Sequence, residues 1–172
     1  LYIGTYKPCQ KKWLKMFKTH KNILDKKEKK DLLAFVKTKI QYLGEDYPGL
    51  QTEGDLHTYK ELNFFLKKIN KHVKPNKINK CWANYTAGDY ISWHSHEGLK
   101  YSIVYYLKSP QKLGVMFTKG KYGVVYTEGL ENSLVIFDGS KTHSMPNSHK
   151  KINRYTIALD ILWVLKKINT QL

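Results

Sequence analysis

The hydrophobic pattern of the chain changes from helical to strand-like near residue 78. Residues 10–43 carry apolar positions at helical spacing between lysines, and the segment GEDYPGLQTEGD then interrupts the pattern. A second helix is predicted to begin at a capping box formed by Thr58 and Glu61 and to end before Pro75. Its apolar face consists of Leu62, Phe65, Leu66, Ile69 and Val73.

The second part of the chain consists of short runs rich in Tyr, Val, Ile and Trp, separated by Gly, Pro, Asn and Ser. These runs are KCWANYTA, DYISWHSH, KYSIVYYLK, GVMFT, YGVVYT, NSLVIFD and RYTIALDILWVL. Seven or eight short strands after two helices predict an antiparallel sandwich or barrel with a helical buttress, which is an α+β fold with an all-β core. We expect one domain over residues 1–172, with 1–77 as a mainly helical support and 78–165 as the core.

Length and composition agree with a folded single domain. The chain has 172 residues and is 41% hydrophobic, which is enough for a sizeable core. No apolar run approaches the roughly 18 residues of a membrane span, because Asp160 interrupts the richest one, IALDILWVL, so no membrane partner is expected. Cys9 and Cys81 are too few for a disulfide framework, and this favours a reducing, cytoplasmic location.

The net charge of +16 favours a polyanionic partner such as nucleic acid, an acidic protein or an anionic metabolite. Much of this charge lies in KKWLK, KKEKK and KKINKHVKPNK, on the predicted helices. A solvated helix face is the favoured explanation of these lysines. Charge alone therefore identifies no substrate.

Arg154 is the only arginine among the 30 Lys and Arg residues. An arginine grips a carboxylate or phosphate with two parallel hydrogen bonds, whereas lysine offers a point charge. If NRYTIALDI is a strand, Arg154, Thr156 and Ala158 share one face. Arginine and a hydroxyl would then point together into the barrel, where they suit a carboxylate ligand. The alternative is an arginine on the surface without a special role.

Three histidines of the strand-rich half have the spacing of a metal site. In SWHSHEG, His94 and His96 lie two residues apart on a predicted strand, so both side chains would point to one face. His143 follows LVIFDGSKT, after a strand and a turn, where its ring could reach the same place. Imidazole is the usual ligand of iron, zinc or copper. The alternative is a surface H-x-H pair with an unrelated third histidine.

These residues resemble the Fe(II)- and 2-oxoglutarate-dependent dioxygenases, whose pattern is a strand-borne H-x-D, a distal His and, about ten residues later, an Arg in R-x-S/T. The resemblance runs from Trp82 to Ile161. Three stretches are similar to the prolyl hydroxylases, namely ANYTAGDYISWHSH, SIVYYLKSP with GVMF, and LVIFDG with NRYTIAL. The resemblance implies that the core is a double-stranded β-helix, a jelly roll similar to the cupin barrel.

The resemblance also implies a role for each site residue. The implied metal ligands, with catalytic roles, are His94, His96 and His143. The implied 2-oxoglutarate contacts are Arg154, Thr156, Tyr106 and Tyr85, among which Arg154 holds the distal carboxylate. The family's aspartate is replaced by His96, as in a branch of the superfamily with H-x-H before an S-x-x-Y-Y run. Glu97 is the alternative ligand, but on a strand it would point to the opposite face.

The implied activity is hydroxylation of a C–H bond with Fe(II), 2-oxoglutarate and O2. A protein or peptide side chain is the expected substrate, and oxidation or demethylation of a nucleic-acid base is the alternative. A cupin-type metal protein also fits GDYISWHSH and HSMPN, although Lys100 and Tyr101 stand where its glutamate is expected. A non-catalytic, basic barrel that binds nucleic acid is the remaining alternative.

Overall fold

The computed structural model describes residues 16–43, 49–73, 77–87, 90–110, 112–119, 123–146 and 153–162. The first part contains β1 (Phe17–Lys21), α1 (Lys26–Lys39), β2 (Leu50–Gln51), the 3-10 turns η1 (Leu56–Thr58) and η2 (Lys60–Leu62), and α2 (Asn63–Ile69). The second part contains β3 (Ile78–Thr86), β4 (Ile91–His94), β5 (Leu99–Lys108), β6 (Leu113–Lys119), β7 (Gly123–Glu128), β8 (Ser133–Phe137), β9 (His143–Met145) and β10 (Arg154–Leu162).

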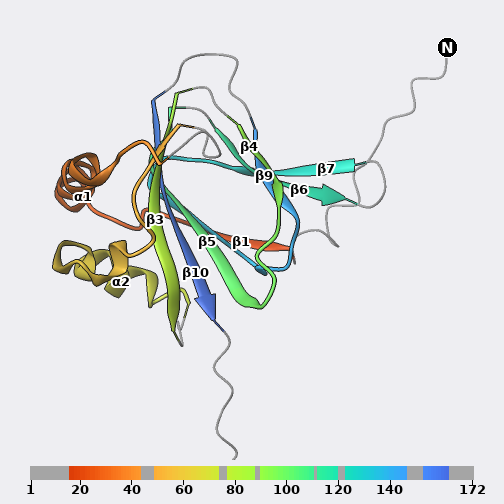
Figure 1. Ribbon diagram of the computed structural model, residues 1–172, viewed down its shortest axis with the longest axis horizontal. Helices are drawn as coiled ribbons and strands as arrows, with labels where there is room; N and C mark the ends of the chain where they lie inside the picture. The colour runs from red at the N-terminus through yellow and green to blue at the C-terminus, as the bar shows by residue number, and fades with distance from the viewer. Residues whose placement is uncertain are drawn as a thin grey trace, which may run out of the picture.

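Two antiparallel sheets face each other, and both helices cover the outer side of the larger one (Figure 1). The larger sheet has six strands in the order β1-β8-β5-β10-β3-β2, and the smaller sheet has four in the order β4-β9-β6-β7. Consecutive strands from β3 to β10 alternate between the two sheets, except for the neighbouring pair β6 and β7, as in a jelly roll. The prediction of an all-β core with a helical buttress is confirmed.

Alternation along the central strand β10 divides the molecule into two environments. Ile157 and Leu159 are buried on the side of the helices, in a core that both helices help to form. Thr156, Ala158 and Asp160 point the other way, into the space between the sheets, where they line a cavity. The face shared by alternate residues of this strand is therefore the one expected from the sequence.

The predicted helix over residues 10–43 is wrong in part. Residues 17–21 form the strand β1, which pairs with β8 at the edge of the larger sheet, and residues 10–15 lie outside the described part of the chain. The helix begins after Asp25, whose side chain accepts a hydrogen bond from the Glu28 backbone N–H, while the Glu28 side chain accepts one from the Asp25 backbone N–H. This capping box separates the strand from the helix, and the strand itself depends on a partner more than 100 positions away.

The second predicted helix is shorter than expected. The segment begins as two 3-10 turns, and α2 itself covers only Asn63–Ile69. The predicted capping box between Thr58 and Glu61 is wrong, since neither the turns nor α2 has a side-chain cap hydrogen bond. The apolar face is nevertheless correct, because Phe65 and Ile69 are buried against the larger sheet. Burial of these residues stabilises the segment whichever helical geometry it adopts.

The strands β1 and β2 show that the segment before residue 78 also contributes to the larger sheet. The organisation as one domain over residues 1–172 stays a prediction, as does the division at residue 78. Within the described ranges, the helices are too short and too polar to cross a membrane.

Candidate metal centre and cavity

Strand pairing places two of the predicted histidines side by side. In the antiparallel pair β4–β9, His94 lies directly opposite His143, so the two side chains leave neighbouring positions on one face. Their ring centroids are 4.2 Å apart. The His143 ring also packs edge-on against Phe137 with a centroid distance of 4.7 Å, and this contact restricts its orientation.

His96 reaches the same place from a loop. The prediction that it shares a strand with His94 is wrong, because β4 ends at His94. The loop is held by a hydrogen bond from the His96 backbone N–H to the Gly139 carbonyl (2.8 Å). A Cβ atom at Gly139 would lie 2.8 Å from the Leu99 Cβ, so this close approach requires glycine. Glu97 is exposed in the following turn and does not join the cluster.

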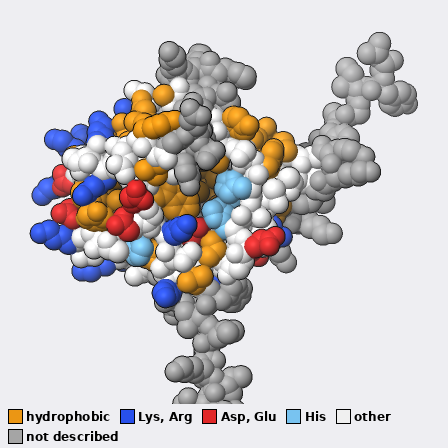
Figure 2. Space-filling model, viewed as in Figure 1, with side chains coloured by type: hydrophobic (Ala, Val, Ile, Leu, Met, Phe, Trp, Pro, Cys, Tyr) orange, Lys and Arg blue, Asp and Glu red, His pale blue; other side chains and the backbone are white. Residues whose placement is uncertain are grey.

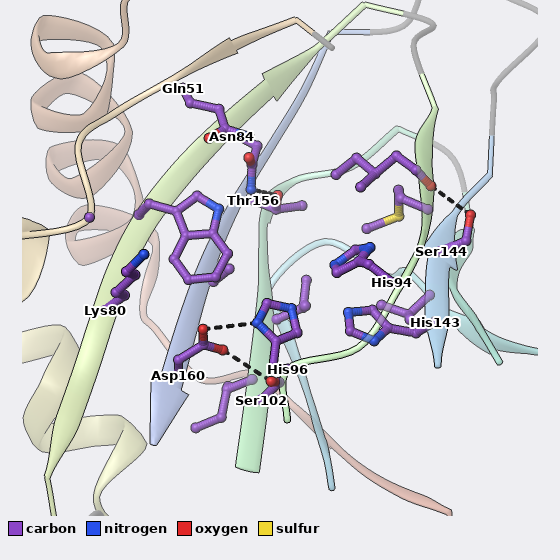
Figure 3. A pocket seen from close by; sticks show the side chains of 18 of the residues that line it. Gln51, Lys80, Asn84, His94, His96, Ser102, His143, Ser144, Thr156 and Asp160 are labelled. Atoms are coloured by element: carbon purple, nitrogen blue, oxygen red, sulfur yellow. Dashed lines mark hydrogen bonds and ion pairs between the residues drawn. The ribbon is translucent and has the colours of Figure 1, made fainter. Parts of the chain in front are cut away.

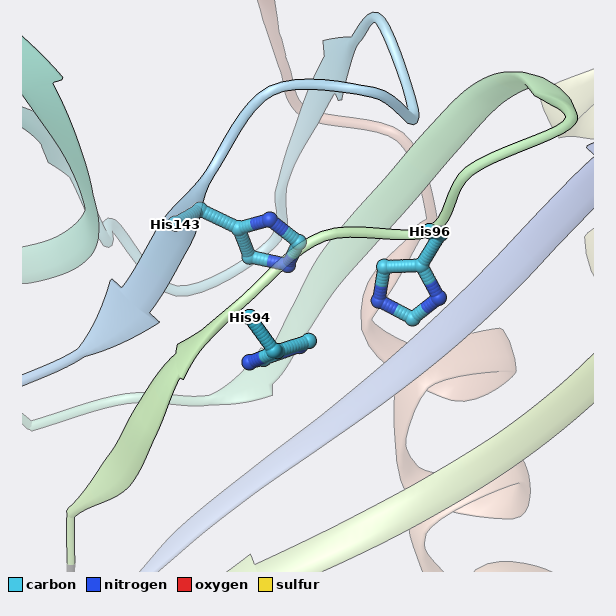
Figure 4. A group of neighbouring side chains, drawn as sticks. All are labelled: His94, His96 and His143. Atoms are coloured by element: carbon cyan, nitrogen blue, oxygen red, sulfur yellow. The ribbon is translucent and has the colours of Figure 1, made fainter.

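The three histidines offer ligand atoms that all lie within 4.8 Å of one another (Figure 4). The Nδ1 atom of His94 lies 2.8 Å from the Ser92 carbonyl, and that of His143 lies 2.8 Å from the Lys141 carbonyl. A carbonyl only accepts, so in each ring Nδ1–H donates and Nε2 keeps its lone pair. This is the arrangement by which proteins fix a metal-binding imidazole.

Burial favours the neutral, metal-binding form of these rings. The pKa of His143 is lowered to about 4, chiefly because burial disfavours the charged ring and further because His94 and His96 lie close by. The hydrogen bond to the Lys141 carbonyl opposes this shift but does not outweigh it. Burial also lowers the pKa of His94. Metal binding near neutral pH therefore displaces no proton from these two rings.

This low pKa predicts that the metal-free protein loses stability in mild acid. Unfolded histidine has a pKa near 6.5. As the pH falls below this value the unfolded chain takes up a proton that folded His143 accepts only near pH 4, so stability present above pH 6.5 is lost. Between pH 7 and 5, His143 alone should cost ~2 kcal/mol of unfolding free energy.

Urea unfolding of the metal-free wild type and of His143→Gln at both pH values measures this difference. We expect the variant to lose less stability than the wild type between pH 7 and 5. An equal loss in both proteins would contradict the low pKa of His143.

The histidines open into a cavity of about 800 Å³ between the two sheets. Figure 2 shows the histidine side chains at the hollow of the face in view, and Figure 3 shows the residues around it. Its wall combines apolar side chains, including Trp82 and Met145, with polar groups from β3 and β10. The volume suits a small organic co-substrate together with part of a larger substrate.

Arg154 is 6% exposed at the start of β10. Its Nε atom donates to the Thr86 hydroxyl (3.1 Å), and within the described part of the chain no carboxylate forms an ion pair with it. Burial of a charged group without an opposite charge is costly, so the guanidinium favours an anionic ligand. Arg154 itself does not line the cavity, but Thr156, two residues further on the same face, does.

Neither predicted tyrosine contact lines the cavity, but Tyr106 lies close to Arg154 and Thr156, whereas Tyr85 lies on the helix side. Tyr106 is fully buried beside Thr156, and its hydroxyl oxygen accepts a hydrogen bond from the Val115 backbone N–H (3.0 Å). It therefore packs between the sheets and does not line the cavity. Tyr85 is not brought to the site, because its ring contacts Tyr155 on the helix side and its hydroxyl donates to the Asn153 side chain (2.8 Å).

Asn84 occupies the cavity face of β3 that Tyr85 was expected to supply. It lines the cavity next to Thr156, with 3.4 Å between its Nδ2 atom and the Thr156 hydroxyl. Its Oδ1 atom is buried and has no hydrogen-bond partner among the described residues, so its amide can bind a polar ligand. Alternation along β3 places Asn84 and Tyr85 on opposite faces, but only the register pair Asn84–Thr156 shows which of the two faces the cavity.

The residues present fit a divalent transition metal such as Fe(II). Three neutral imidazole nitrogens form a donor set typical of iron, zinc or copper, and three protein ligands leave further positions of the metal for other ligands. The residues that would hold the ion are His94, His96 and His143. All three were predicted from the sequence, and the structure brings them together.

No protein-family model matches the sequence, and no curated protein sequence matches it significantly. Solved structures do match. One is a prolyl hydroxylase from Trichoplax adhaerens in complex with a hypoxia inducible factor peptide (TM-score 0.67, 14% identity, 87% of this chain and 86% of that chain covered). A second is a prolyl-4-hydroxylase from Pseudomonas putida (TM-score 0.65, 15% identity, 88% and 96% covered).

A third similar structure is HygX from Streptomyces hygroscopicus, solved with nickel, 2-oxoglutarate and hygromycin B (TM-score 0.63, 10% identity, 84% and 81% covered). At these identities the likeness concerns the fold. The chain therefore has the fold of the Fe(II)- and 2-oxoglutarate-dependent oxygenases, as the resemblance of its sequence implies.

Proposed function

We propose that the protein is an Fe(II)- and 2-oxoglutarate-dependent dioxygenase that hydroxylates a C–H bond. The observation that carries this proposal is the buried Arg154, which forms no ion pair with any described residue and lies on the strand that also lines the three-histidine cavity. A metal site alone is common to many proteins. A metal site together with a buried receptor for a carboxylate suits a small dicarboxylate co-substrate.

Each part of the site has a role in this proposal. The three histidines hold Fe(II), which when bound supplies the oxidising chemistry with O2 and 2-oxoglutarate. Arg154 pairs with the distal carboxylate of 2-oxoglutarate, and Thr156 and Asn84 bind along its length. The apolar wall excludes water and positions the substrate.

A protein or peptide side chain is the substrate that we propose. Two of the similar structures are prolyl hydroxylases, and one of them holds a peptide. The aromatic residues that line the cavity support this choice. Trp82 and the 55% exposed Tyr90 offer an apolar surface on which a substrate side chain can pack. HygX, with hygromycin B bound, shows that the same fold also takes small molecules.

Nucleic acid is the second candidate, favoured by the net charge of +16. The lysines, however, gather on the side of α1 and α2 in the face shown in Figure 2. Lys80 is the one Lys or Arg among the described residues that line the cavity. A phosphate backbone lying across the cavity would need more positive charge there, so we rank a nucleic-acid substrate second.

The two remaining functional hypotheses, a cupin-type metal protein and a non-catalytic barrel, explain fewer features of the site. A cupin-type protein uses the metal site but gives no role to the buried Arg154, which forms no ion pair within the described ranges. A non-catalytic barrel that binds nucleic acid explains neither the converged histidines nor the cavity. We keep the cytoplasmic location expected from the cysteines as part of the proposal.

Release of succinate from 2-oxoglutarate tests the proposed function when it is measured with a panel of peptides, oligonucleotides and free amino acids. We expect turnover that requires Fe(II) and is stimulated by a peptide. Stimulation only by alkylated DNA or RNA would reverse the substrate ranking. Failure to bind 2-oxoglutarate in the presence of Fe(II) would contradict the dioxygenase proposal itself.

A further inference from the structure

Asp160 is a buried carboxylate directly behind one of the metal-binding histidines. It is 4% exposed, and its Oδ2 atom lies 3.0 Å from Nδ1 of His96 (Figure 3). Its Oδ1 atom accepts a hydrogen bond from the Ser102 hydroxyl at 3.0 Å. Both carboxylate oxygens thus have a partner, which is Ser102 on the neighbouring strand for Oδ1 and His96 of the metal site for Oδ2.

The sheet itself builds this arrangement. Asp160 and Ser102 are register partners on β10 and β5, so their side chains meet on the cavity face. The facing residue on β3 is Lys80, which also lines the cavity but forms no ion pair with Asp160 within the described ranges. Ser102 therefore helps to direct the carboxylate to His96, and Lys80 forms no ion pair that would compete with this contact within the described ranges.

We propose that Asp160 is a positioning residue of the metal centre, which fixes the His96 ring and supplies the negative charge that the ligand set lacks. This inference rests on the proposed metal site. Because Asp160 accepts the Nδ1–H of His96, the ring presents Nε2 to the other two histidines. The site then has three neutral ligands and one carboxylate that acts through His96.

The carboxylate also compensates for a departure from the sequence pattern of the dioxygenases. His96 stands where that pattern has a carboxylate ligand, and this exchange alone would leave the protein's own ligand set without a negative charge to oppose that of a divalent cation. A carboxylate hydrogen-bonded to a metal-binding imidazole raises the basicity of that ring and strengthens metal binding. The negative charge of Asp160 thus lies behind the His96 ring, whereas a carboxylate ligand would place it directly on the metal.

Titration of the metal-free protein with Co(II), followed by its visible absorption, tests this proposal without any turnover. Asp160→Asn keeps the shape and can still accept the hydrogen bond, but it removes the charge. We expect its Co(II) affinity to fall on the order of tenfold. Ser102→Ala, which only frees the carboxylate to move, should cause a smaller loss of a few-fold.

The matched control is Glu53→Gln, because Glu53 lines the same cavity but its side chain bonds Gln41 (3.3 Å) and no histidine. It removes the same charge and should leave Co(II) affinity unchanged. The melting temperature of each metal-free variant reports on folding separately. If Asp160→Asn does not fold, the proposal is tested by Ser102→Ala, whose Co(II) affinity should be lower than that of the Glu53→Gln control.

Two failures have different meanings. If the wild type binds no Co(II), the metal site and the proposed function are both wrong. If the wild type binds Co(II) and Asp160→Asn binds it as tightly as Glu53→Gln does, the metal site stands and the role of Asp160 is wrong. A spectrum of bound Co(II) that changes only in Asp160→Asn and Ser102→Ala would support the positioning role.

Discussion

Replacement of His143 by alanine is expected to abolish specific metal binding. His143 supplies one of only three ligand atoms in the cluster, and it alone is supplied by β9. Loss of a residue that merely supports a ligand costs about 10- to 100-fold in affinity, so loss of the ligand itself should cost more than that. Anaerobic titration of the metal-free variant with Fe(II) measures the effect.

The matched control is His72→Ala, which removes an exposed histidine that stacks on His20 at 4.2 Å, outside the cluster. It should bind Fe(II) as the wild type does. The alanine at position 143 leaves the space of one ring beside Phe137, so added imidazole should restore part of the binding. Unchanged Fe(II) affinity in His143→Ala would contradict the metal centre.

Replacement of Arg154 by lysine is expected to weaken 2-oxoglutarate binding about ten- to a hundredfold. The substitution keeps the charge but loses the planar fork, and a hydrogen bond to a charged group contributes roughly 1.5 to 3 kcal/mol. Arg154 is buried and already held by Thr86, which orients the guanidinium for a bidentate contact. Metal affinity should hardly change, since Arg154 is not part of the cluster.

Anaerobic calorimetry with Fe(II) present measures this affinity. The matched control is Lys80→Arg, the reverse exchange at the one lysine that lines the described cavity, and it should alter 2-oxoglutarate affinity little. Equal affinities in wild type and Arg154→Lys would show that the lone arginine has another role.

Much of the site could be predicted because its residues are either of a type that is rare in this chain or closely spaced in the sequence. The single arginine and the H-x-H pair stand out in a lysine-rich chain. Strand alternation then predicts that Arg154 and Thr156 share a face, and in the structure Thr156 lines the cavity while Ile157 lies in the core on the other side of β10.

Asp160 was missed because the sequence presents it only as a charge within the apolar run IALDILWVL. Its partners Ser102 and His96 lie far away in the sequence, so only the pairing of β10 with β5 reveals them. A signal was available, since Asp160 shares the alternation of Arg154, Thr156 and Ala158. A buried charge on the ligand-binding face of a strand indicates a functional partner.

The remaining errors arise where tertiary partners outweigh local pattern. The strand β1 looks helical from its lysine spacing, but it is fixed by pairing with β8. The face of Tyr85 depends on the register of β3, and one position of offset exchanges it with Asn84. The co-substrate contact of Tyr106 stays a prediction, because the hydrogen bond from the Val115 N–H does not use its hydroxyl proton.

The most direct measurement of the central claim is 2-oxoglutarate binding by the wild-type protein, made anaerobically with and without Fe(II). Because the co-substrate is proposed to contact both the metal and Arg154, binding should be tight with Fe(II) and much weaker in the metal-free protein. His143→Ala should resemble the metal-free wild type even when Fe(II) is added. Absence of binding with Fe(II), or binding that does not depend on Fe(II), would contradict the assignment as a 2-oxoglutarate-dependent dioxygenase.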